Sequence, residues 1–339
     1  LSVRDGICLL LMNIDQIYTR ITGNSKLFVL SGILNSTVQI VVAVLMILLF
    51  RINALTMLIA PTIGALTATL FLEFKSRLSI RFSKNLIDRN FMKVLLKFSI
   101  PLAFNSVAYW AITNLNRYYA AYYFGYEEAS YLSVVNKVTL VLTLAGSIYS
   151  LAWQESAFEQ IHYKERSKYY TNMFSIYLAI FTAATVVFIT LFNLLFPILI
   201  GQNYINAQIL LVPTFLITFF SGIAGFFGQI FNAEKMTKKL MTSTLIGFII
   251  NISALLYLTR FFGLIAVPIV TAISFAFVSF IRITLLKKKK LFQFQGYEIL
   301  VSLLFIFLIS TLNYFINDIE NLIIILFASV VILIIVYNK

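Results

Sequence analysis

The sequence is poor in the residues that build most catalytic and metal sites. It contains one cysteine, Cys8, and one histidine, His162, among 339 residues. A single cysteine excludes a disulfide within the chain and a cysteine-based metal site. The histidine lies beside Lys164, Glu165 and Arg166, a setting typical of a solvated loop rather than of a Ser-His-Asp triad. We therefore expect no metal, no cofactor and no catalytic residue, and we predict that the protein is not an enzyme.

Acidic residues and glycine-rich loops are also scarce. Asp and Glu number 13 against 26 Lys and Arg, which gives a formal net charge of +13. The sequence has no glycine-rich loop of the kind that cradles nucleotide phosphates, which argues against nucleotide hydrolysis. The positive charge is spread over the segments between apolar runs, so it does not indicate a nucleic-acid partner.

Long apolar runs dominate the rest of the chain, which is 60% hydrophobic. A run near twenty residues can cross roughly 30 Å of hydrocarbon as a helix. The fold class predicted is therefore all-α, a polytopic transmembrane helical bundle. A partial span is expected at residues 6–18, and ten full spans are expected at 28–50, 53–73, 98–124, 129–153, 171–200, 206–231, 240–259, 263–285, 297–315 and 322–336.

The basic residues alternate from one connection to the next. Lys and Arg gather in residues 20–26, 75–97, 164–168, 235–239 and 282–290 and at the C-terminus, whereas the alternate connections hold only Arg51 and Arg260 as cations. Cytoplasmic loops carry this excess of positive charge. We predict a multi-pass protein of the inner, cytoplasmic membrane with its C-terminus in the cytoplasm.

Two cations, Arg117 and Lys137, interrupt apolar runs. Each lies seven or eight residues from the short segment 125–128 that joins their spans, which places both about 10 Å below one membrane face. A charge at a helix centre costs about 2.5–3.5 kcal/mol on insertion scales. A neighbouring pair of equal sign therefore indicates a role, and the role that explains it most directly is to receive an anionic ligand.

Polar residues share faces with these cations at helical spacing. Ser133, Asn136, Thr143, Ser147 and Ser150 continue the pattern of Lys137 along span 129–153. Polar faces on several spans predict a wet cavity. Arg matches phosphate oxygens, and amides and aromatic rings suit sugars. The candidate substrate-binding residues are Arg117, Lys137, Asn114, Asn116, Asn136, Trp110, Asn35 and Gln39, and Asp15 and Arg20 are candidates for ion coupling or gating.

Structural interpretations of the same residues remain open. Arg117 can extend to the outer interface among the tyrosines that follow it. Lys137 can pair with Asp15 or cap backbone carbonyls of a broken helix. The Asn and Ser stripes can also be ordinary hydrogen bonds between helices.

Four segments carry a resemblance to a known family. They are residues 95–101 (LLKFSIP), 131–137 (YLSVVNK), 231–237 (FNAEKMT) and 263–268 (GLIAVP), with Asn116 and Arg117 between the first two. The chain resembles the bacterial polysaccharide transporters, the O-antigen or capsule repeat-unit flippases of the multidrug/oligosaccharidyl-lipid/polysaccharide exporter superfamily. Members commonly carry an Asp before the Arg, where this chain has Asn116, so the resemblance does not extend to carboxylate-based ion coupling at that position.

The resemblance implies a two-lobed fold of fourteen spans, from which this chain lacks the first three to four. Residues 1–74 are then the rest of the N-terminal lobe, 75–91 a cytoplasmic linker helix, 92–290 the six-helix C-terminal lobe and 291–339 a peripheral terminal pair. The implied substrate is an undecaprenyl-diphosphate-linked oligosaccharide, moved to the outer leaflet by alternating access. The implied partners are membrane lipids and the polysaccharide polymerase and chain-length machinery.

Three other functions remain as alternatives. A lipid II-type flippase also needs cations in its cavity. A multidrug or cation antiporter of the same superfamily favours a carboxylate in the second-lobe cavity, and spans 98–124, 206–231, 240–259 and 263–285 contain none. An integral-membrane polysaccharide polymerase needs a sizeable loop outside the membrane, and the outer connections here are a few residues long.

Overall fold

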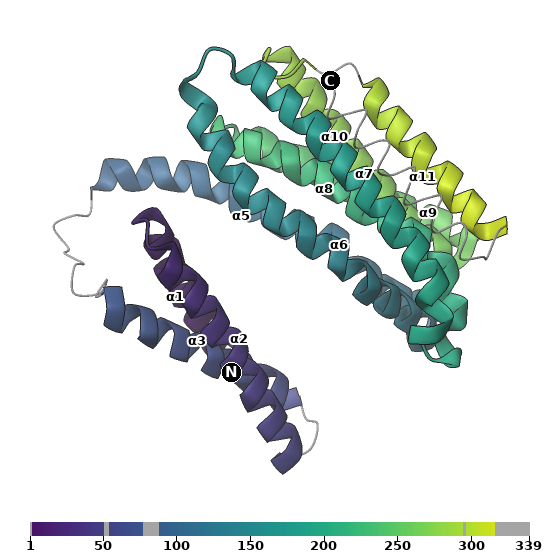
Figure 1. The fold of residues 1–339 in the computed structure, drawn as a ribbon, viewed down its shortest axis with the longest axis horizontal. Helices are drawn as coiled ribbons and strands as arrows, with labels where there is room; N and C mark the ends of the chain where they lie inside the picture. Colours follow the sequence, from purple (N-terminus) through teal and green to yellow (C-terminus); the bar gives the residue numbers. More distant parts are fainter. Residues whose placement is uncertain (1, 51–53, 77–87, 294–295, 316–339) are drawn as a thin grey trace. The chain divides into compact units, whose positions relative to one another are not determined.

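The computed structural model describes residues 2–50, 54–76, 88–293 and 296–315 (Figure 1). All regular elements in these ranges are helices, so the all-helical fold class predicted from the apolar runs is confirmed. The chain divides into two compact units, Leu1–Met92 and Lys93–Lys339, and each unit is described by itself. The predicted span 322–336 and most of the predicted linker helix 75–91 lie outside the described residues.

The first unit contains three helices, α1 (Ser2–Ile21), α2 (Ser25–Phe50) and α3 (Ala54–Ser76). Both α1 and α2 pack against α3. The contact between α2 and α3 is close at Gly64, where an added Cβ would lie 2.7 Å from Oδ1 of Asn35. A glycine at this point lets two membrane helices approach each other.

The second unit contains seven α-helices within its described residues. They are α5 (Arg89–Phe124, which begins in the first unit), α6 (Tyr126–Glu159), α7 (Arg166–Leu199), α8 (Leu211–Ala233), α9 (Thr237–Phe262), α10 (Ala266–Lys288) and α11 (Tyr297–Phe315). The span predicted at 206–231 begins as a 3₁₀ segment, Gln202–Leu210, before α8. Helix α11 runs alongside α7 (Figure 1).

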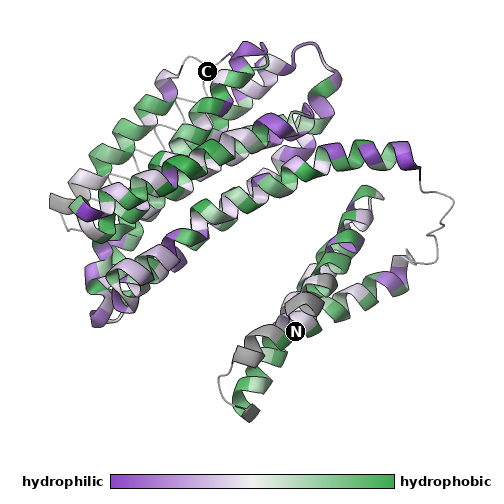
Figure 2. Ribbon diagram, turned by 180° about the vertical axis from the view of Figure 1, so that it is seen from behind, coloured by the Kyte–Doolittle hydropathy of each residue, from purple (hydrophilic) through white to green (hydrophobic). Residues whose placement is uncertain are grey.

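Six helical segments of the described chain are long and apolar enough to cross a membrane. One of them, Thr237–Lys288, is 52 residues long and consists of α9 and α10, which pack against each other. Figure 2 shows hydrophilic residues gathered at the ends of the helices of the second unit and hydrophobic residues along their middles. This distribution matches a bilayer with an apolar centre and two polar faces.

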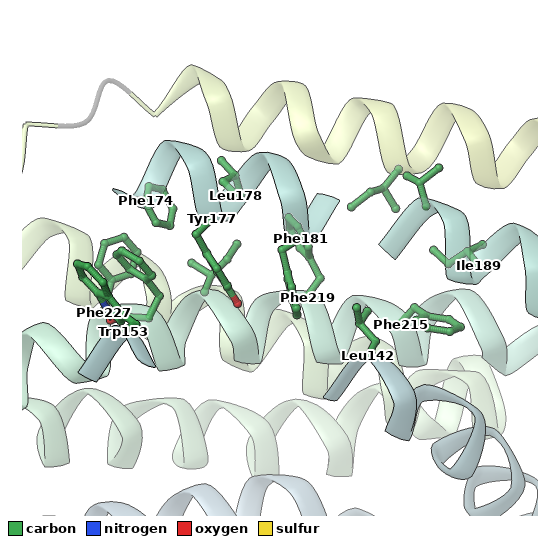
Figure 3. Packing of buried hydrophobic residues seen from close by; sticks show 14 of the residues in the cluster. Leu142, Trp153, Phe174, Tyr177, Leu178, Phe181, Ile189, Phe215, Phe219 and Phe227 are labelled. Atoms are coloured by element: carbon green, nitrogen blue, oxygen red, sulfur yellow. Dashed lines mark hydrogen bonds between the residues drawn. The ribbon is translucent and has the colours of Figure 1, made fainter. Parts of the chain in front are cut away.

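Aromatic side chains hold α6, α7 and α8 together. Trp153 of α6 stacks on Phe226 of α8 with ring centroids 4.4 Å apart, and its indole Nε1 donates a hydrogen bond to the Phe226 carbonyl at 3.0 Å. Phe174 and Tyr177 extend this cluster from α7, facing α8 (Figure 3). The hydrogen bond satisfies the one polar atom of Trp153, so the ring can be buried at little cost.

Glycine allows the tight connection between α5 and α6. Gly125 has φ of 97°, a conformation that glycine adopts far more readily than residues with a Cβ. Because only this residue separates Phe124 from Tyr126, the two helices that carry Arg117 and Lys137 are directly joined.

Candidate functional site

Three of the predicted site residues share one face of α5. Trp110 and Arg117 are exposed on the second unit, and Asn114 between them is half-buried. The amide Nδ2 of Asn114 donates to the Trp110 carbonyl at 3.0 Å and to the Thr113 hydroxyl at 2.9 Å. The side-chain oxygen Oδ1 of Asn114 is therefore available to accept a hydrogen bond from a ligand. This face therefore presents an aromatic ring, an amide and a guanidinium in succession.

Asn116 points in another direction. It is 5% exposed, and its Nδ2 donates to the Thr271 hydroxyl of α10 and, at 2.9 Å, to the Ile112 carbonyl. Neighbouring residues of a helix project about 100° apart, so Arg117 and Asn116 cannot share a face. Asn116 joins α5 to α10, whereas Arg117 lies on the exposed surface of α5.

The candidates on α6 are adjacent in sequence and differ in burial. Lys137 is exposed and Asn136 is half-buried. Among the residues that the structure describes, neither Arg117 nor Lys137 forms an ion pair or hydrogen bond. Two cations thus remain without an internal anionic partner on two helices of membrane-spanning length.

The other four candidates belong to the first unit. Asn35 and Gln39 of α2 lie at the close contact with Gly64 of α3, and Oδ1 of Asn35 is buried there without a hydrogen-bond partner among the described residues. Asp15 of α1 is 6% exposed, and Arg20 lies near the end of the same helix. These side chains therefore stand at or near helix contacts within their unit.

The second unit contains a cavity whose lining the sequence predicted only in part. Its volume is about 140 Å³, and it is lined by residues of α5, α6, α7 and α8. The α6 wall consists of Thr143, Ser147 and Ser150 with Gly146 and Tyr149. The polar stripe of α6 was visible in the sequence because its members recur at helical spacing. The parts of the wall from α5 and α7 had no such signal.

The opposite walls combine hydroxyls with aromatic rings. Tyr109 comes from α5, Tyr177 and Phe181 from α7, and Thr218 and Ser221 from α8. The α8 wall also contains two glycines, which keep side chains out of the space.

The structure places a further cation, Arg282, where the charge count did not expect one. The charge pattern of the sequence assigned Arg282 to the cytoplasmic cluster of basic residues 282–290. In the structure its side chain is only 3% exposed. Nε donates to the Ser243 hydroxyl at 3.1 Å, Nη2 to the Thr244 hydroxyl at 2.8 Å, and Nη1 to the Ala224 carbonyl. Arg282 therefore ties α10 to α8 and α9. Loop assignment from charge alone is wrong here because the guanidinium finds its partners in neighbouring helices.

The described part of the chain contains no cluster of three His, Cys, Asp or Glu residues that could hold a metal ion. Helices α5, α7, α8, α9 and α10 contain no carboxylate. The cavity lining and the exposed face of α5 thus offer hydroxyls, aromatic rings, an amide and a guanidinium, which are groups that bind ligands.

No protein-family model matches this sequence, and no curated protein sequence matches it. Two solved structures resemble its fold, each with a TM-score of 0.66. The first, "Lipid II flippase MurJ, inward closed conformation", is 19% identical, and the match covers 98% of this chain and 71% of that one. The second, a crystal structure of a MATE point mutant, is 16% identical, with 84% and 66% covered. The likeness therefore supports the helical-bundle fold that was predicted from the sequence.

Proposed function

We propose that this protein is a membrane transporter that moves undecaprenyl-diphosphate-linked oligosaccharide repeat units from the cytoplasmic to the outer leaflet by alternating access. The observation that carries this proposal is the pair Arg117 and Lys137. Both are exposed on the second unit, have no anionic partner among the described residues, and stand on adjacent helices long enough to span a bilayer. Such cations mark pathways for anions through membranes.

The chemistry of the two side chains fits a diphosphate. The Arg117 fork can hold two phosphate oxygens at once, and the Lys137 ammonium adds a mobile point charge. Asn114, Asn136 and Trp110 lie next to these cations in sequence or on the same face, and amides and aromatic rings recognise sugar hydroxyls and ring faces. The lipid tail stays in the bilayer throughout, so the protein has to shelter only the head group.

The membrane potential favours this direction of movement. An inside-negative potential drives an anion outward by about 2.3 kcal/mol per charge per 100 mV. The proposed location is the cytoplasmic membrane with the Lys-rich connections and the C-terminus inside, as the charge alternation predicts. The polysaccharide polymerase and chain-length machinery are the expected downstream partners.

A lipid II flippase is the second candidate, and the likeness to the MurJ fold favours it. Lipid-linked repeat units and lipid II share the diphosphate and differ in the group attached to it, so both need the same cations. An antiporter for cationic drugs is less consistent with the chain, because the helices α5 and α7 to α10 lack carboxylates.

Transport by the purified protein in liposomes tests the proposal. Each charge-assisted hydrogen bond is worth about 1.5–3 kcal/mol, so Arg117→Gln or Lys137→Gln should weaken substrate binding about 10- to 100-fold. The matched control is Arg260→Gln, which removes an exposed cation at the end of α9.

Two undecaprenyl lipids serve as substrates in this assay, one carrying a neutral oligosaccharide and the other being lipid II. Faster transport of the first supports the repeat-unit flippase, and faster transport of the second supports the alternative. Wild-type rates in the double variant Arg117→Gln/Lys137→Gln would refute both assignments.

A further inference from the structure

The cavity of the second unit is lined by hydroxyls that have no hydrogen-bond partner among the described residues. Tyr177 is 4% exposed and Thr218 is 7% exposed, and both line the cavity. Neither side-chain hydroxyl forms a hydrogen bond with any residue that the structure describes. Neither oxygen is among the fully enclosed polar atoms, so both can bond to water in the cavity or to a ligand that enters it. The cavity is therefore built to receive a partner with hydrogen-bonding groups.

The lining selects against charged partners. The residues around the cavity contribute hydroxyls and aromatic rings, and none of them is acidic or basic. An ionic ligand would lose its hydration here without gaining an opposite charge. A neutral ligand with several hydroxyls on an apolar ring, by contrast, can bond to the hydroxyls of the lining and pack against the aromatic side chains beside them.

The size of the cavity fits one such ring. Its volume of about 140 Å³ is enough for roughly ten water molecules. One hexose has a similar number of non-hydrogen atoms and therefore needs a similar space. Gly225 keeps this space open, since a Cβ built on it meets no atom within 4 Å. Gly222 has a different role, because a Cβ there would lie 2.5 Å from the Tyr177 hydroxyl.

We propose that this cavity is a subsite for one neutral sugar of the transported glycan. The proposal rests on the function proposed above, because it assumes a glycan attached to a diphosphate at Arg117 and Lys137. Asn136 and Thr143 are seven residues apart and therefore share a face of α6. Thr143 lines the cavity, so this face leads from the residue beside Lys137 to the cavity wall, about 10 Å further along the helix. A sugar that follows the diphosphate can reach the hydroxyls of Tyr177 and Thr218.

Binding of two probes to the purified full chain in lipid nanodiscs tests the subsite. One probe is undecaprenyl diphosphate, and the other is the same lipid carrying a single N-acetylglucosamine. Two hydrogen bonds to the sugar should give the glycosylated probe about tenfold higher affinity in the wild-type protein. Gly225→Leu fills the cavity and should abolish this advantage while leaving the affinity for undecaprenyl diphosphate unchanged.

Two further variants make the outcome specific. Tyr177→Phe removes one unpartnered hydroxyl and should reduce the advantage by about threefold. Ser253→Leu is the control for added bulk, since Ser253 is exposed on α9, away from the cavity, and it should behave as wild type.

The possible failures are distinguishable. Equal affinity of the wild type for both probes, or an undiminished sugar advantage in Gly225→Leu, would overturn the subsite while diphosphate binding stands. If the wild type bound neither probe, the proposed function would fail together with the subsite.

Discussion

Replacing Arg282 by Lys should destabilise the second unit although the charge is kept. The guanidinium donates three hydrogen bonds, to the hydroxyls of Ser243 and Thr244 on α9 and to the Ala224 carbonyl on α8. A lysine has one nitrogen and cannot reach acceptors on two helices with the same geometry. At least one bond to a charged donor is lost, and the burial cost of the cation remains.

The loss can be estimated from these bonds. Each hydrogen bond to a charged group contributes about 1.5–3 kcal/mol, and the charge stays buried, so we expect a destabilisation of about 2–4 kcal/mol. For a unit of this size that corresponds to a decrease in Tm of about 5–12 °C. Arg282→Met should cost less, because it removes the charge together with its desolvation penalty. Ser243 and Thr244 also keep their own hydrogen bonds to the Leu240 carbonyl.

Thermal unfolding in detergent, followed by tryptophan fluorescence, measures this effect. Trp153 is 3% exposed and reports on the packing of α6 against α8, and a Trp110→Phe background removes the second tryptophan. Arg260→Lys is the matched control, since Arg260 is exposed at the end of α9. A Tm of Arg282→Lys within about 2 °C of the wild type, or a lower Tm for Arg282→Met than for Arg282→Lys, would contradict the reasoning.

Three other substitutions test the packing. Gly247→Leu should destabilise the contact of α9 with α10 by about 2–4 kcal/mol, because even a Cβ at this position would clash with Val278. A normal Tm in detergent would contradict this close approach. Trp153→Phe leaves a carbonyl of α8 without its indole donor and should lower the free energy of unfolding by about 1–3 kcal/mol in denaturant titrations. Glu234→Gln breaks the 3.0 Å ion pair with Arg166 and should lower the free energy of unfolding by no more than about 1 kcal/mol. A difference in this free energy that persists at high salt would contradict a purely electrostatic contribution of the pair.

Much of the fold follows from one-dimensional patterns. The apolar runs near twenty residues long predict membrane helices because hydrocarbon leaves the backbone no other way to satisfy its hydrogen bonds. The helices α2, α5, α6, α9 and α11 accordingly cover their predicted spans, and α7 ends one residue short of its own. The start of α8 differed, because residues 206–210 of the predicted span belong to the 3₁₀ segment Gln202–Leu210, and hydropathy does not distinguish the two kinds of helix.

The candidate site was also predictable only in part from the sequence. The polar stripe of α6 was accessible from spacing, because residues three, four or seven apart share a helix face, whereas the exposure of Arg117 and Lys137 comes from the packed unit. Asn116 was a candidate for substrate binding, but only the packed structure shows that it bonds to Thr271 of α10. The partners of Arg282 were equally invisible in the sequence.

The chain's apolar runs and their charged ends therefore dictate that it is a bundle of membrane helices, since burial in lipid depends on local composition. Which polar side chains meet inside that bundle depends on contacts between residues far apart in sequence. Tyr109, Ser150, Tyr177 and Thr218 line one cavity only because four helices bring them together, and no single helix contains that information.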